Sequence, residues 1–273
     1  MGESELGRFG GMDHLTRWID RSASFRISSL DGSESCRILA IVHDLDGEGA
    51  RGIAQAVSGA LLLASDLKSG QTISLQMEVG NRIYHADATA DGLVRAKVSE
   101  RGDDSSTGLA KVRRLGEGGV LYQSVAEAHA STVQEMLQAF LDQSEQQPTW
   151  LDLPVELDAQ GLPIRVRGAW LRGFPATPRK ALAELAASWK RRCGPWDASS
   201  PGTGLCVEGW DALERHEIVV FCPCSRERAL RALVALGAEG ALEAKAKGEP
   251  LEVVCDFCRS AYSFDPNEVL SVI

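Results

Sequence analysis

The chain has 273 residues, of which 44% are hydrophobic and 25% charged, a composition that is typical of folded globular proteins and excludes bulk disorder. Its formal net charge is −9, which argues against nucleic acid as the main partner, because binding phosphates needs clustered basic side chains. Residues 1–15 carry charges and no apolar run, so no secretory signal is expected. The longest apolar stretch, residues 54–64, is about half the length of a membrane span. We therefore expect a cytoplasmic protein without membrane association.

The chain begins with a mixture of predicted helices and strands. Residues 13–19 are expected to form a short helix, because their apolar side chains fall on one face. Residues 24–28 and 37–42 are expected to be strands. Residues 52–68, rich in Ala, Gly and Leu, predict a buried and closely packed helix.

A series of strands separated by glycine-containing turns follows this helix. Alternating polar and apolar residues predict these strands at residues 72–79, 82–88, 93–98 and 120–124. The dipeptide Gly80-Asn81 is typical of a hairpin turn, and Asp91-Gly92 marks a second turn. The sequence therefore predicts an antiparallel meander and not a βαβ arrangement.

One more helix and two strands complete the predicted first domain. Ser131 or Thr132 is expected to cap a helix that ends before Pro148. Strands are expected at residues 150–156 and 164–174, and Pro154 limits the first of them to the edge of a sheet. Residues 1–175 thus predict an α+β domain with an antiparallel sheet and packed helices.

A linker and a small domain are expected to follow. The linker, residues 176–216, contains an amphipathic helix whose apolar positions are Leu182, Leu185 and Trp189. Its later part holds a Ser/Pro/Gly run at residues 199–204, which disfavours regular structure. Residues 217–273 are expected to form a compact C-terminal domain.

Four cysteines in this last domain carry the strongest chemical signal. They stand as two close pairs, Cys222 with Cys224 and Cys255 with Cys258, separated by thirty residues. Such spacing supplies the four thiolates of a tetrahedral structural zinc site. The alternative, four buried cysteines that act as small hydrophobic residues, fits the paired spacing poorly. We therefore expect one Zn²⁺ per chain, bound by these four residues.

The surrounding sequence fits a small metal-dependent domain. Predicted strands lead into each pair, at residues 218–221 and 251–254, and Ser225 is placed to cap a helix after the first pair. Tyr262 and Phe264 alternate on a strand that leaves the second pair. A domain of this size buries few apolar residues, so a metal would supply much of its stability.

Spacing alone does not decide between a static zinc site and a redox switch. Each pair is close enough along the chain to close on itself as a disulfide once the metal leaves. The Cys222–Cys224 disulfide would close a small, strained ring, and strained disulfides are labile.

The sequence also resembles a known family, the heat shock protein 33 family of redox-regulated holdase chaperones. The resemblance is carried first by Cys222-Pro-Cys-Ser-Arg-Glu-Arg228 and the distant Cys-x-x-Cys. It extends, in the same order, over further segments at residues 13–17, 61–75, 140–149, 254–258 and 262–264. It covers most of the chain.

The resemblance implies a function and a site. In the reduced family members zinc is bound by the residues that correspond to Cys222, Cys224, Cys255 and Cys258, and the protein is inactive. Oxidants form the disulfides Cys222–Cys224 and Cys255–Cys258 and release zinc. The small domain and linker then unfold, and the protein dimerises and holds unfolding client proteins without ATP. The resemblance thus implies a chaperone, and not an enzyme.

The chain departs from the family pattern in three places. Residues 79–83 lack an expected Gly-Pro element, and residues 193–206 are rich in Gly, Pro and Ser where a longer charged helix is usual. Cys36, Cys193 and Cys206 are additional cysteines. The linker differences concern the activation threshold and not the zinc site.

Three other interpretations fit parts of the sequence. The pattern Gly47-Glu-Gly-Ala-Arg-Gly52 resembles a dinucleotide-binding loop, but nearby acidic residues would repel phosphate, so a polar turn that starts a packed helix is favoured. A thiol oxidoreductase is disfavoured because Cys255 lies between two strands and not at a helix start. A constitutive zinc ribbon that binds a protein partner stays open as the alternative. Residues 222–273 hold six basic and eight acidic residues, which disfavours nucleic acid.

Overall fold

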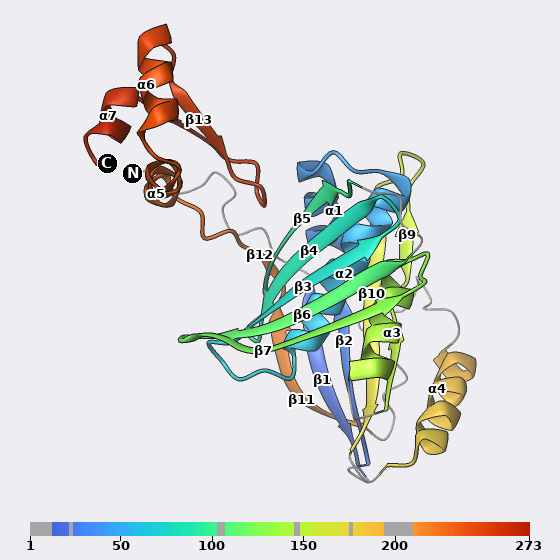
Figure 1. Ribbon diagram of the computed structural model, residues 1–273. Helices are drawn as coiled ribbons and strands as arrows, with labels where there is room; N and C mark the ends of the chain where they lie inside the picture. The colour runs from blue at the N-terminus through green and yellow to red at the C-terminus, as the bar shows by residue number, and fades with distance from the viewer. Residues whose placement is uncertain (1–12, 22–23, 103–106, 145–147, 175–176, 194–209) are drawn as a thin grey trace. The chain divides into compact units, whose positions relative to one another are not determined.

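The computed structural model describes residues 13–21, 24–102, 107–144, 148–174, 177–193 and 210–273 (Figure 1). These residues fall into two compact units, a large unit that ends at Val220 and a small unit that starts at Phe221. The 199–204 run and Cys206 lie outside the described residues. Within the described part of the chain, no helix has both the length and the apolar composition of a membrane span.

The large unit contains two six-stranded sheets. The strands of the first run in the order β11-β1-β2-β10-β8, with β9 also paired to β10, and all neighbours are antiparallel. Their bounds are β11 (Trp210–Glu217), β1 (His14–Asp20), β2 (Phe25–Asp31), β10 (Pro163–Gly173), β8 (Thr149–Asp152) and β9 (Val155–Leu157). Because β8 ends the sheet, the edge position that Pro154 predicted for this region is confirmed.

The second sheet has the order β12-β5-β4-β3-β6-β7. Its strands are β12 (Val219–Val220), β5 (Leu93–Glu100), β4 (Arg82–Thr89), β3 (Thr72–Val79), β6 (Gly108–Gly116) and β7 (Gly119–Ala128). Only β12, which pairs with β5, runs parallel to its neighbour among the described strands. Val79 pairs with Arg82, so the hairpin turn predicted at Gly80-Asn81 is confirmed. The predicted α+β class with antiparallel sheets is also confirmed.

Helix α2 (Gly47–Ala64) forms the centre of the large unit (Figure 1). It contacts β3, β4 and β5 of one sheet and β2, β9 and β10 of the other. Fifteen of its eighteen residues are buried, as its Ala- and Gly-rich composition predicted, because small side chains allow close approach on every face. Helices α1 (Ser33–Val42) and α3 (Val133–Ser144) pack against it.

Close packing around α2 depends on glycine at one position in particular. A Cβ atom at residue 52 would overlap the ring of Tyr84, which is 4% exposed. We expect Gly52→Ala to lower the free energy of unfolding of the large unit by about 1–3 kcal/mol, because a rigid buried ring must move. Denaturant unfolding measures this loss. Gly118→Ala is the control, since no atom lies within 4 Å of its added Cβ. Equal stability of the two variants would contradict the expectation.

Helix α4 (Arg179–Cys193) confirms the helix predicted in the linker, and it packs on the first sheet. Leu182 and Ala186 are buried in a cluster with Ile27 of β2 and Leu171 of β10. Leu185 packs against the same cluster, whereas the side chain of Trp189 lies outside the described part. The range assigned to the linker also contains β11, which pairs with β1 along its length and so belongs to the sheet.

Two predictions from local pattern were wrong. Residues 13–19 are a strand, β1, and not a helix, because β1 is hydrogen-bonded to β2 on one side and β11 on the other. Residues 37–42 belong to helix α1 and not to a strand. The Asp13 carboxylate accepts hydrogen bonds from the backbone N–H groups of Glu34 and Ser35 at the start of this helix. A cap from a distant residue cannot be recognised in the local sequence.

The small unit is built from three helices and one hairpin. In chain order these are α5 (Arg226–Leu236), α6 (Ala238–Lys247), β13 (Leu251–Val254), β14 (Ala261–Phe264) and α7 (Pro266–Leu270). The predicted strands at residues 251–254 and around Tyr262 are confirmed, whereas α6 and α7 were not predicted. Its described core has only four buried members, Ala229, Ala241, Phe264 and Val269. So small a core contributes little stability.

Candidate metal centre

The four predicted cysteines of the small unit come together at one point. The Sγ atoms of Cys222, Cys224, Cys255 and Cys258 all lie within 4.8 Å of one another. Cys222 and Cys258 are buried, whereas Cys224 and Cys255 are partly exposed. This is the group among the described residues whose ligand atoms are placed to hold a metal ion.

The sulfur–sulfur distances fit tetrahedral coordination. Cys222 Sγ lies 3.7 Å from Cys255 Sγ, and Cys224 Sγ lies 3.2 Å from Cys258 Sγ. Four sulfur ligands at about 2.3 Å from a central ion would be separated from one another by about 3.8 Å. The donor set and its spacing therefore fit a thiolate-bound metal, with two ligands from each segment.

A tight turn brings Cys255 and Cys258 to the same side. The backbone N–H of Arg259 donates to the Cys255 carbonyl at 2.8 Å, and the Cys255 N–H donates to the Ser260 carbonyl at 2.9 Å. Arg259 takes a left-handed conformation, with φ of 58°, which is uncommon for a residue other than glycine. The strained backbone conformation therefore lies in the turn that holds two of the ligands.

The segment around Cys222 and Cys224 is fixed by the residues that follow it. The Ser225 hydroxyl accepts a hydrogen bond from the Arg228 N–H and caps α5, as predicted. The Arg228 guanidinium donates to the carbonyl of Pro223, between the two cysteines, at 2.8 Å. The conformation of the Cys-Pro-Cys segment is therefore tied to the start of α5.

Arg226 connects the first cysteine pair to β14 and α7, the elements that follow the second pair. Its guanidinium donates to the Ser263 carbonyl and to the Glu268 carboxylate, and lies 4.2 Å from the centroid of the Phe264 ring. Reasoning from the sequence assigned no role to Arg226 or Arg228. Their position directly after the first cysteine pair was the feature of the sequence that could have indicated such a role.

Two hydroxyl groups contact the cysteine sulfurs. Tyr262 Oη lies 3.1 Å from Cys224 Sγ, and Ser260 Oγ lies 3.2 Å from Cys258 Sγ. The sequence predicts Tyr262 as a strand residue and gives it no role at the metal centre. The hairpin register brings its hydroxyl to the metal centre, so only the folded arrangement shows this contact.

Burial makes several of these thiols hard to ionise without a cation. Desolvation raises the pKa of Cys222 strongly and also raises that of Cys224, and negative charge on neighbouring thiols adds to both effects. For Cys258, desolvation acts in the same direction, but hydrogen bonds with the Ser260 side chain and backbone and with the Cys224 and Cys255 thiols together outweigh it and lower the pKa to about 7. A bound cation would offset the repulsion between four thiolates.

The other cysteines lie apart from this centre or outside the described residues. Cys36 is fully buried in α1, with its Sγ 3.9 Å from the Ala54 carbonyl oxygen, and burial raises its pKa well above the usual range. It is a core residue of the large unit. The side chain of Cys193 and all of Cys206 lie outside the described residues.

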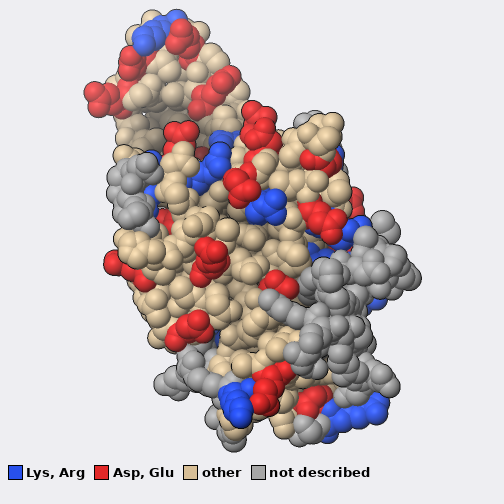
Figure 2. Space-filling view, turned by 90° about the vertical axis from the view of Figure 1, so that its right-hand side faces the viewer, with Lys and Arg blue, Asp and Glu red and all other residues tan. Residues whose placement is uncertain are grey.

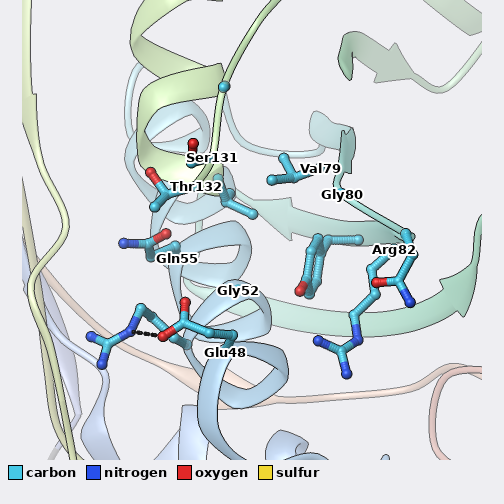
Figure 3. Close-up of a pocket in the computed structure, with 13 residues that line it drawn as sticks. Glu48, Gly52, Gln55, Val79, Gly80, Arg82, Ser131 and Thr132 are labelled. Carbon is cyan, nitrogen blue, oxygen red and sulfur yellow. Dashed lines mark hydrogen bonds and ion pairs between the residues drawn. The ribbon is translucent and has the colours of Figure 1, made fainter. Parts of the chain in front are cut away.

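The dinucleotide-like pattern at residues 47–52 begins α2 and follows a helix, α1, and not a strand, so it lacks the context of a phosphate-binding loop. It borders a hollow of about 440 Å³ between α2, the β3–β4 turn and the start of α3 (Figure 3). Arg51 on this side donates to Glu48 and to the Val155 carbonyl. The interpretation as the start of a packed helix is confirmed, because residues 47–52 form the first turns of α2.

Comparison with known proteins gives one consistent family. The family model described as Hsp33 protein matches residues 13–265. The 33 kDa chaperonin of Pelobacter propionicus is 27% identical, with 94% of this chain and 92% of that protein covered. The 33 kDa chaperonin of Syntrophotalea carbinolica is also 27% identical, with 96% and 99% covered.

A solved structure shares the fold. The crystal structure of the 33 kDa chaperonin (heat shock protein 33 homolog) from Thermotoga maritima superposes with a TM-score of 0.77. Its sequence is 22% identical, and the match covers 95% of this chain and 98% of that one.

Proposed function

Because the chain belongs to the Hsp33 family, we propose that it is a redox-regulated, ATP-independent holdase chaperone that binds unfolding proteins under oxidative stress. Its four clustered cysteines bind one Zn²⁺ when reduced and form two disulfides when oxidised. The observation that carries the proposal is the set of four converging sulfur atoms in a unit with only a small described core. The chain acts by holding clients and not as an enzyme.

Zinc is the metal that this donor set favours. Four thiolates with near-tetrahedral spacing match the ligands and geometry of structural zinc sites, whereas Mg²⁺ and Ca²⁺ prefer oxygen ligands. The ion would supply a cross-link between residues 222–224 and 255–258 and a charge that stabilises the thiolates. The hydrogen bonds of Arg226 and Arg228 hold the two segments in place around it.

Oxidation by peroxide removes the ligands in two steps. A thiolate attacks one peroxide oxygen with its electron pair, the O–O bond breaks, and a sulfenic acid and hydroxide form. A second thiolate then attacks the sulfenic sulfur, expels its oxygen as hydroxide and closes a disulfide. Formation of each disulfide thus transfers two electrons from its two thiolates to one peroxide molecule. The pairing Cys222–Cys224 and Cys255–Cys258 is the one that the family implies.

Loss of the metal would then expose apolar surface. The small unit would lose its main cross-link, and the adjoining linker would lose a folded neighbour along the chain. Helix α4 covers Ile27 and Leu171 with Leu182 and Ala186. Its release would expose both sides of this contact, and exposed apolar patches bind unfolded chains.

The proposed partners follow from this surface. They are unfolding client proteins and, in the oxidised state, a second copy of the chain, in the cytoplasm. Nucleic acid and membranes are not proposed as partners. On the face drawn in Figure 2, acidic and basic side chains are interspersed among uncharged ones, without a continuous basic stripe.

A constitutive zinc ribbon that binds a protein partner, without a redox switch, is the second candidate. The observation in its favour is that the folded small unit already exposes Leu236, Leu242 and Val254. These side chains are 83%, 55% and 49% exposed. Such a module would bind its partner while zinc is present.

The redox state of the active form distinguishes the two candidates. We expect peroxide-treated protein, and not the reduced zinc-bound protein, to suppress light scattering by a thermally unfolding client in the absence of nucleotide. The physical reason is that the α4 contact is covered until the metal leaves. Reduced and oxidised samples are compared side by side, with dithiothreitol added to the oxidised sample as the reversal control. Equal protection by both forms, or by neither, would remove the redox proposal.

A further inference from the structure

Tyr262 is held in place by packing that does not depend on its hydroxyl group. It lies on β14 opposite Val253 of β13, and its ring packs against the core of the small unit. The hairpin and the ring contacts therefore fix the position of Oη, 3.1 Å from Cys224 Sγ. The ring places a single polar atom beside one sulfur of the metal centre.

In the metal-bound state the direction of this hydrogen bond is determined by chemistry. A thiolate that coordinates a metal carries no proton, so it can only accept a hydrogen bond. Tyr262 Oη must then be the donor and Cys224 Sγ the acceptor. Ser260 Oγ, 3.2 Å from Cys258 Sγ, has the same relation to the second pair. Among the described residues, neither Cys222 nor Cys255 has a hydroxyl contact of this kind.

We propose that Tyr262 is a positioning residue that protects Cys224 from oxidation by donating a hydrogen bond to its sulfur. The inference rests on the proposed zinc switch and assigns one residue that sets its sensitivity. The attacking electron pair in the peroxide reaction belongs to the thiolate sulfur. A donor directed at that sulfur withdraws electron density, and less basic thiolates are weaker nucleophiles. It also blocks one direction of approach to a sulfur that is partly exposed.

The test replaces the hydroxyl and keeps the ring. Zinc-loaded Tyr262→Phe is treated with hydrogen peroxide in the presence of a chromophoric zinc chelator. We expect zinc release about three- to tenfold faster than in the unaltered protein, because nucleophilicity follows basicity with a slope of about one half. Timed alkylation and mass spectrometry should show Cys224 oxidised earlier. Without oxidant, zinc affinity should fall by about tenfold, as for other groups that hold metal ligands.

Two variants separate this effect from a general loss of structure. Tyr122→Phe removes a hydroxyl from exposed β7 of the large unit and should release zinc at the unaltered rate. Site-specific 3-fluorotyrosine at position 262 keeps the ring and makes the hydroxyl a stronger donor, so zinc release should become slower. If Tyr262 merely filled space, Tyr262→Phe and 3-fluorotyrosine would not change the rate of zinc release in opposite directions.

The outcomes also separate this inference from the proposed function. If the unaltered protein releases no zinc with peroxide, the redox proposal fails, and this inference fails with it. If the unaltered protein releases zinc and Tyr262→Phe does so at the same rate or more slowly, the inference alone is overturned. If Tyr262→Phe does not load zinc, the fluorotyrosine protein decides, and an unchanged rate there overturns the inference.

Discussion

Removal of zinc is expected to unfold residues 221–273 while the large unit keeps its structure. The small unit has four buried residues in its described core, whereas the main core of the large unit spans both sheets and α2. Structural zinc contributes about 10–16 kcal/mol of apparent folding free energy in small zinc domains. Chelation should therefore abolish hydrogen-exchange protection in β13, β14 and α5, and leave α2 and β3 protected.

Removing one ligand of each pair is expected to prevent zinc binding and so to unfold the small unit as chelation does. The unaltered reduced protein should contain one zinc per chain, and Cys222→Ser/Cys255→Ser should contain none. Cys36→Ala is the matched cysteine control, because Cys36 lies in the core of the large unit and should not affect zinc content. Zinc retained in the double variant, or equal loss of protection in both units on chelation, would contradict the assignment.

Asp66→Ala is expected to destabilise the large unit by about 3–5 kcal/mol. The carboxylate of Asp66, just after α2, accepts hydrogen bonds from Arg26 of β2 at 2.8 Å and Arg172 of β10 at 2.7 Å. The side chains of Asp66 and Arg172 are only 15% and 7% exposed. Removing the carboxylate would leave two guanidinium groups close together and without their shared partner charge. Denaturant unfolding, followed by hydrogen exchange in peptides of β2 and β10, measures the loss.

An exposed carboxylate of the same type provides the control. Asp211 lies 3.6 Å from Arg21, and their side chains are 60% and 72% exposed. Solvent screens such a pair, so Asp211→Asn should change the free energy of unfolding by less than about 1 kcal/mol. A loss at Asp66 no larger than that at Asp211 would show that the buried network contributes no more than a surface pair.

Features that depend on local spacing were predictable from the chain alone. The cysteine pairs at 222–224 and 255–258 have the spacing of metal ligands, and the structure brings their sulfurs together. The buried α2, the hairpin at Gly80-Asn81 and the apolar stripe of α3 follow from composition and periodicity within a few residues. These predictions agree with the structure because the contacts on which they depend are local or repeat along one element.

Other features depend on partners that are distant in sequence. Residues 13–19 form a strand because β11, about two hundred residues later, pairs with them, and Asp13 caps a helix that it precedes by twenty residues. The contact between Tyr262 and Cys224 arises from the register of one hairpin, and the shared carboxylate of Asp66 arises where two strands and a helix end meet. The local sequence thus specifies which side chains can bind a metal. Only tertiary packing determines which hydroxyl, carboxylate or strand lies beside them, because these contacts join segments with no common local pattern.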